Sequence, residues 1–337
     1  MRINDIPHLS RRPNDGRVVM LQPWFDTTEA KWHDFAQLET GDSIELTIQG
    51  MLSGIYYAKG PASQGDLCVP LFTLVAQHLS FPKVAGPTYD LVSDLQLLSA
   101  SIEKLSLLRE TSVDSGARSF LVETELEYMF MLVRSICDLL QSIVKHIAGL
   151  MQTSDGKAAV KKILPDSFAD VVLTSTSTPN EKVPRTLDDL QMKYMLPMAL
   201  ASFYVGHGAR FNRLRTIRNG IGHRGKRLPM IFETERGFGI SVVGPSAWSS
   251  LDVWKQHELL PNQIGSVRAL GAFLAKTILD VLLDLEVALR KTISPALLPA
   301  AISEGNLVFL TNPFIRNLSG VDAILASPWL ETAEGSS

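Results

Sequence analysis

Four long stretches of this sequence carry apolar residues at spacings of three and four, and this pattern restricts the fold more than any other feature. The stretches cover residues 89–110, 119–150, 186–223 and 262–291. Such spacing places the apolar side chains on one face of an α-helix, which must then pack against another element. Several long helices of this kind are typical of a bundle. We therefore predict a mainly α fold built as an antiparallel helical bundle.

Smaller elements accompany the predicted bundle. Alternating polar and apolar residues over Ser43–Gln49 predict one strand in an otherwise irregular α+β segment. Residues 230–234 and 239–243 flank a Glu-Arg-Gly-Phe sequence and predict a small β-hairpin. In the third helical stretch, Thr186 and Asp189 resemble a capping box, and Pro197 predicts a bend.

The same patterns predict three parts of the chain. Residues 1–85 form an N-terminal segment to which the sequence assigns no role, residues 86–292 form the helical domain, and residues 293–337 form a C-terminal tail. No apolar run follows the charged N-terminus, and the least charged stretch, Tyr194–Ala209, is too short to span a membrane. We therefore expect a cytoplasmic protein with no membrane partner.

The composition excludes several classes of site. The formal net charge is −3, which gives no global reason to expect nucleic acid, so a role with RNA must rest on a local patch. The two cysteines, Cys68 and Cys137, form neither a disulfide framework nor a metal cluster, and the seven histidines lack metal-ligand spacing. We predict neither a metal site nor a cofactor.

One segment, Arg210–Arg227, has a strong local excess of positive charge. It contains no carboxylate and eight basic or potentially basic residues: Arg210, Arg213, Arg215, Arg218, His223, Arg224, Lys226 and Arg227. Such a patch attracts phosphate groups. The alternative is a solvated helix face whose cations pair with acids elsewhere in the fold.

Helical geometry sorts the residues of this segment. Phe211, Leu214, Ile217 and Ile221 form one apolar stripe, while Arg215, Asn219 and His223 stack on another face. Arg218 projects within the apolar stripe, where it must meet an acid, a carbonyl group or a bound anion. A structural ion pair explains Arg218 equally well. Gly220 and Gly222 indicate either the close approach of another group or simply the fraying end of a helix.

The sequence Arg218-Asn219, followed after three residues by His223, resembles the motif of the HEPN superfamily. The flanking Leu214–Ile217 and Arg224–Gly225 are similar to that family's usual surroundings. The resemblance implies a helical, metal-independent endoribonuclease of a prokaryotic toxin or defence system. It also implies a homodimer whose two motifs face each other, with an antitoxin or defence protein as a further partner. Many members are inactive, so a non-catalytic module that binds RNA, a nucleotide or a protein is the alternative.

The residues themselves suit this chemistry. Cleavage of RNA by its own 2′-hydroxyl needs a group to accept that proton and a group to protonate the leaving 5′-oxygen. His223 can do either at neutral pH, and Arg218 can stabilise the charge on the transferring phosphate. Asn219 can orient either group, while Arg213, Arg215 and Arg224 are candidates for phosphate contacts. One histidine per chain supplies only the acid or the base, so two chains are needed.

A second group of polar residues lies in a narrow band on the stretch 119–150. Its members are Glu123, Glu127, Arg134, Asp138, Gln141 and Lys145. The band is either a thin solvent-exposed face or the lining of a polar groove. On the second interpretation, Glu127 and Arg134 support the site around Arg218 and His223.

Overall fold

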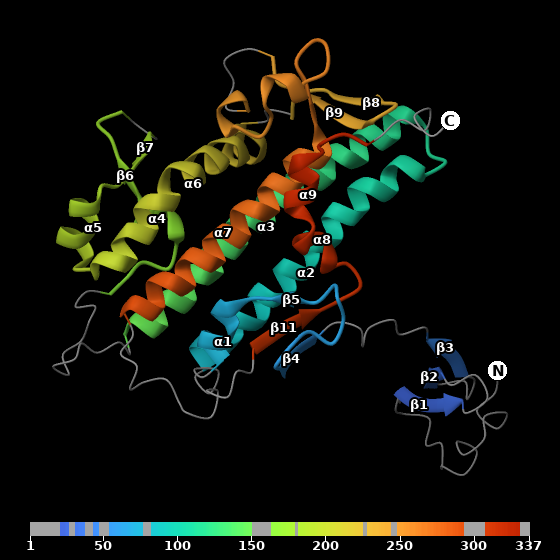
Figure 1. Cartoon of the computed structure of the whole chain (residues 1–337), viewed down its shortest axis with the longest axis horizontal. Helices are drawn as coiled ribbons and strands as arrows, with labels where there is room; N and C mark the ends of the chain where they lie inside the picture. Colours follow the sequence, from blue (N-terminus) through green and yellow to red (C-terminus); the bar gives the residue numbers. More distant parts are fainter. Residues whose placement is uncertain are drawn as a thin grey trace. The chain divides into compact units, whose positions relative to one another are not determined.

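The computed structural model of the chain divides into two compact units, Met1–Gly54 and Ile55–Ser337 (Figure 1). The structure describes residues 21–26, 31–37, 43–46, 54–76, 82–149, 163–178, 181–224, 228–243, 248–292 and 307–330, and it leaves out the side chains before residue 54, of Tyr57 and of residues 222–224. The division lies at Gly54, and residues Pro70–Ala76, which form α1, pack against the helical unit.

The first unit contains a three-stranded antiparallel sheet. Its strands are β1 (Leu21–Asp26), β2 (Lys31–Gln37) and β3 (Ser43–Leu46), in that order across the sheet. The predicted strand at Ser43–Gln49 is therefore present over Ser43–Leu46.

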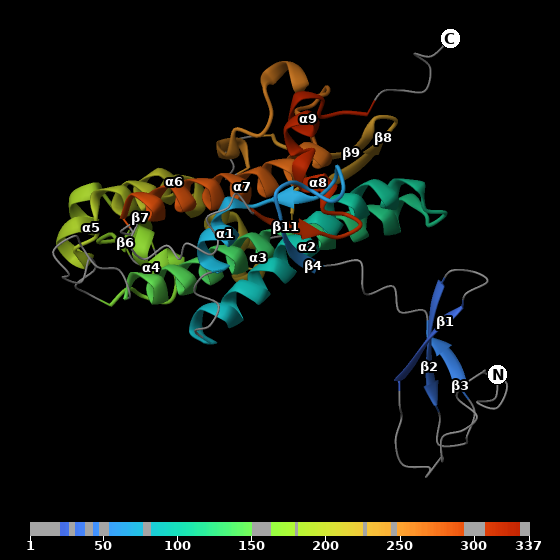
Figure 2. The same cartoon turned by 60° about the horizontal axis from the view of Figure 1, so that its bottom comes forward.

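The second unit is mainly helical, as predicted, and its long helices pack in pairs. They are α2 (Pro82–Glu110), α3 (Ser115–Ala148), α6 (Met198–Arg224) and α7 (Val267–Thr292). Helix α2 packs along α3, α7 packs against both, and α6 packs against α3 and α7 (Figures 1 and 2). Asp114 caps the start of α3 by accepting a hydrogen bond from the Ala117 N–H at 3.1 Å. All four predicted helical stretches thus contribute to one core.

The third predicted helix is two helices. Helix α5 (Leu187–Tyr194) begins at the predicted Thr186–Asp189 capping box, and α6 begins only at Met198. Met195 ends α5 in the left-handed conformation, with φ 55°. Pro197 then lacks the N–H that a continuous helix would use. The prediction of a single bent helix over 186–223 is wrong at this point.

The predicted hairpin is present, and a third strand extends it. Strands β8 (Ile231–Thr234) and β9 (Gly237–Ser241) are joined by a two-residue turn, which Gly237 closes with φ 111°. Strand β10 (Ile264–Ser266) pairs with β9. The prediction that the last long helix begins at residue 262 is wrong, because Asn262 and Gln263 have positive φ and lead into β10.

Residues 307–330 of the predicted tail contribute to the core. Strand β11 (Leu307–Thr311) lies between β4 (Gly54–Ala58) and β5 (Leu67–Cys68) in a three-stranded sheet. Two short helices, α8 (Arg316–Ser319) and α9 (Val321–Ala326), follow it and pack against α7.

Short elements complete the helical unit. They are α1 (Pro70–Ala76), α4 (Phe168–Val172), β6 (Leu173–Ser175), β7 (Lys182–Pro184) and two 3₁₀ turns at Ser249–Leu251 and Gln256–Glu258. Phe168 of α4 contacts the rings of Phe203, Tyr204 and Phe211 of α6, which fixes α4 against that helix. Within the described ranges, no helix combines the length and the hydropathy that crossing a membrane requires.

Candidate functional site

The candidate segment occupies the last turns of α6. The helix continues through Gly220 and Gly222 to Arg224, so the glycines do not end it. Phe211, Leu214 and Ile217 are buried, and Ile221 packs against the core, as the predicted apolar stripe requires. The side chains of His223 and Arg224 lie outside the described residues, as do Lys226 and Arg227.

Arg218 and Asn219 lie half-buried beside each other. Nη1 of Arg218 donates a hydrogen bond to Oδ1 of Asn219 at 3.4 Å. An arginine that is turned inward needs a polar acceptor within reach, and Asn219 supplies one. The hydrogen bond also orients the Asn219 amide, whose oxygen is turned toward the guanidinium.

Arg215 lies one turn earlier on α6 and interacts with α3. Its side chain is half-buried, and this burial, together with the positive charge of Arg134, lowers the pKa of its guanidinium, although Asp170 opposes the change. Two arginines from different helices therefore lie close enough to repel each other. The structure thus brings together Arg134 and Arg215, which sequence analysis had assigned to two separate groups.

The polar band of α3 faces protein along part of its length. Nε of Arg134 lies 3.5 Å from Oδ2 of Asp138. Oδ1 of Asp138 accepts hydrogen bonds from the Ser167 hydroxyl at 3.1 Å and the Phe168 N–H at 2.9 Å, at the start of α4. Around Arg134 and Asp138 the band therefore contacts the start of α4, while the two side chains stay 39% and 32% exposed.

Glu127 lies two turns before Arg134 on the same band of α3. Its side chain is half-buried, and burial, with the nearby charge of Glu123, raises the pKa of its carboxyl group. A carboxyl group with a raised pKa can exchange protons closer to neutral pH. Its placement beside His223 stays a prediction, because that histidine's side chain is outside the described residues.

Two cations of the basic segment are paired with other elements. Arg210 forms an ion pair with Asp280 of α7 at 3.1 Å. Arg213 donates to the carbonyl of Ser250 at 2.6 Å and lies 3.4 Å from Asp252, in the turn that follows the β8–β9 hairpin. For these two residues the structure favours the alternative of paired cations, so Arg213 is the weakest of the predicted phosphate contacts.

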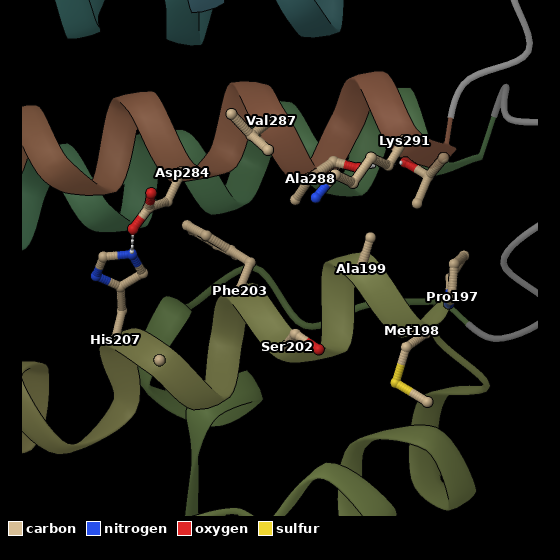
Figure 3. A pocket seen from close by; sticks show the side chains of 12 residues that line it. Pro197, Met198, Ala199, Ser202, Phe203, His207, Asp284, Val287, Ala288 and Lys291 are labelled. Atoms are coloured by element: carbon tan, nitrogen blue, oxygen red, sulfur yellow. Dashed lines mark hydrogen bonds and ion pairs between the residues drawn. The ribbon is translucent and has the colours of Figure 1, made fainter.

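A groove between α6 and α7 was not predicted as a site. At its wall, Nε2 of His207 lies 3.0 Å from Oδ2 of Asp284 (Figure 3). Burial lowers the pKa of His207, although Asp284 opposes the change. The sequence signal was a histidine on the buried side of α6, together with an acidic stripe, Asp280 and Asp284, on α7. Their pairing could not be derived without the register of the two helices.

Comparison of this chain with protein-family models, with curated proteins and with solved structures finds no match.

Proposed function

We propose that this chain is a HEPN-like protein that binds RNA along the C-terminal half of α6 and cleaves it without a metal ion. The observation that carries the proposal is the approach of Arg134 to Arg215, one turn from Arg218. Half-buried like charges are costly unless an anion lies near them. Asp138 and Asp170 offset part of this charge, and an RNA phosphate would offset more.

The proposed reaction assigns a role to each residue of the motif. The RNA 2′-hydroxyl attacks the adjacent phosphorus, the bond to the 5′-oxygen breaks, and a 2′,3′-cyclic phosphate and a 5′-hydroxyl result. Arg218 stabilises the phosphate charge in the transition state, and Asn219 positions Arg218 through the hydrogen bond between them. His223 transfers a proton at one of the two oxygens.

The proposal includes a homodimer. A single histidine cannot accept one proton and donate another in the same step, so a second chain supplies the second His223. A half-buried carboxylate with a raised pKa, Glu127, is the candidate for the second proton-transfer group if one chain acts alone. An antitoxin or defence protein that covers the same end of α6 would block the reaction.

The experiment is an incubation of the full chain with total RNA in the presence of EDTA. We expect fragments that end in cyclic phosphates, and we expect His223→Ala to abolish them while RNA binding is retained. His257→Ala, which alters an exposed histidine of a 3₁₀ turn, is the matched control and should leave cleavage unchanged.

The second candidate function is a binding module without catalysis. The observation that favours it is that Arg210 and Arg213 form ion pairs with acids of other elements, so fewer cations are left to bind RNA phosphates. Wild-type protein that binds RNA but gives no fragments, with binding unchanged in His223→Ala, would establish this function and reject the nuclease.

A further inference from the structure

A groove of about 780 Å³ lies between the first turns of α6 and the last turns of α7 (Figure 3). Its lining is largely apolar, with Met198, Ala199 and Phe203 from α6 and Val287 and Ala288 from α7. A volume of this size is in the range of sites for small organic molecules, which are mostly apolar with a few placed polar groups.

The two charged groups of the groove have opposite signs and lie at different levels. Asp284 and Lys291 are seven residues apart on α7 and both line the groove. Seven residues make two helical turns, which separates them by about 10 Å along the axis. The groove therefore presents a negative charge, an apolar middle and a positive charge, in that order.

Lys291 differs from its neighbours on α7. Arg290 pairs with Glu286, and Lys276 pairs with Asp280 and Asp322. In the part of the chain that the structure describes, no acid forms an ion pair with Lys291, which is exposed at the end of the groove.

The carboxylate of Asp284 lies open to solvent at the wall of the groove. Its side chain is 63% exposed, and its only described partner is His207. The lowered pKa of His207 leaves the imidazole neutral at neutral pH, so it orients the carboxylate without cancelling its charge. The Phe203 ring packs against the imidazole, with 5.1 Å between the two ring centroids.

The groove has free space next to this pair. A Cβ atom added at Gly206 would meet no atom within 4 Å. The space for a Cβ at this position is therefore open, and a larger side chain can extend from it into the groove that Gly206 lines.

We propose that the groove binds an elongated organic zwitterion, with its anionic group at Lys291, its cationic group at Asp284 and its apolar chain along Phe203 and Ala288. Charge complementarity at both ends selects this class over a simple anion or cation. The site is independent of the proposed ribonuclease activity, because the groove lies at the opposite end of α6 from Arg218 and His223.

The first test is calorimetric titration of the full chain with four probes. They are ω-aminooctanoate, octanoate, octylamine and ω-aminobutanoate. We expect ω-aminooctanoate to bind at least about tenfold more tightly than the other three, since each lacks one charge or the length to join the two charges. Equal affinity for all four probes, or no heat with any of them, would overturn the proposal.

Two sets of variants locate the binding. Gly206→Leu should abolish binding of ω-aminooctanoate while the chain stays folded by circular dichroism, and Ala209→Leu, on an exposed position of the same helix, should not. Lys291→Glu and Asp284→Lys should each weaken binding about tenfold or more. The double variant, in which the two charges are exchanged, should restore tight binding of ω-aminooctanoate, with the ligand bound in the opposite orientation. Unchanged binding in Gly206→Leu, or a double variant that stays as weak as the singles, contradicts the assignment.

Discussion

The hydroxyl of Tyr204 donates a hydrogen bond to Oε1 of Gln141, with 2.6 Å between the two oxygens, in the interior between α6 and α3. Both side chains are about 1% exposed. Nε2 of Gln141 in turn donates to the carbonyl of Pro165 at 2.9 Å, so one amide joins three segments. The bond fixes the register of α6 on α3, and it is this register that brings Arg215 to Arg134.

The first prediction tests that bond. Tyr204→Phe leaves the Gln141 oxygen buried without its donor, so the free energy of unfolding should fall by about 1–3 kcal/mol in urea titrations. Tyr89→Phe, which removes a hydroxyl from a ring that is 59% exposed, should change it by less than about 0.5 kcal/mol. Equal effects of the two substitutions would show that the buried bond contributes nothing.

The second prediction compares two glycines. A Cβ at Gly265 would lie 2.5 Å from Cε2 of Trp254, whose ring is held by a hydrogen bond to the Ser266 carbonyl. Gly265→Ala should therefore lower the melting temperature. Gly206→Ala, with open space around its Cβ and a helical position, should raise the free energy of unfolding by about 0.5–1 kcal/mol. A stabilising Gly265→Ala would contradict the close contact with Trp254.

The third prediction concerns acid stability and His207. Burial depresses its pKa below the ordinary 6.5 in the folded state, so the unfolded chain binds the proton more readily. The contribution of this histidine to stability is fully present above pH 6.5 and is lost as the pH falls through its folded pKa. His207→Gln should therefore reduce the loss of stability between about pH 7.5 and about pH 5.5, measured by urea unfolding.

His146 should also contribute to the loss of stability in acid, because burial and the charges of Lys83 and Lys145 lower its pKa. His146→Gln should remove a further part of the acid loss, and His257→Gln serves as the exposed control. An undiminished acid loss in His207→Gln would show that His207 is not responsible.

The fourth prediction separates binding from chemistry at the proposed RNA site. Arg218→Ala should lower the rate of RNA cleavage by about 10² or more, since it removes charge stabilisation in the transition state. Arg215→Ala should weaken RNA binding and reduce its salt dependence, as loss of a phosphate contact does. Arg213→Ala should change the cleavage rate and RNA binding little, because the Arg213 guanidinium is bound to Ser250 and Asp252.

Elements whose cause is local could be predicted from the sequence. The capping box at Thr186 and Asp189, the hairpin around Gly237 and the buried stripe Phe211, Leu214 and Ile217 depend only on residues near in sequence. The helical class followed from the same periodicities. These features could be derived because neighbouring residues alone decide them.

Features that depend on distant residues were missed. The strand β10 forms because β9 supplies a partner edge, and β11 forms because β4 and β5 do. The pairing of His207 with Asp284 follows from the register of α6 on α7, and that of Arg213 with Asp252 from the packing of the Ser249–Leu251 turn against α6. No single segment encodes either. Arg134 was predicted as a supporting residue, but its electrostatic effect on Arg215 became visible only in the structure.

The position of β11 in the sheet has a consequence for synthesis. Phe309 pairs with Cys68, so the strand that completes this sheet leaves the ribosome long after its partner. Until then, β5 lacks its neighbour, and the Thr73 hydroxyl of α1 lacks the Val308 N–H that it accepts. Because β11 is the central strand, β4 and β5 both stay without a partner strand throughout translation of the bundle, and a chain truncated before β11 would leave them unpaired.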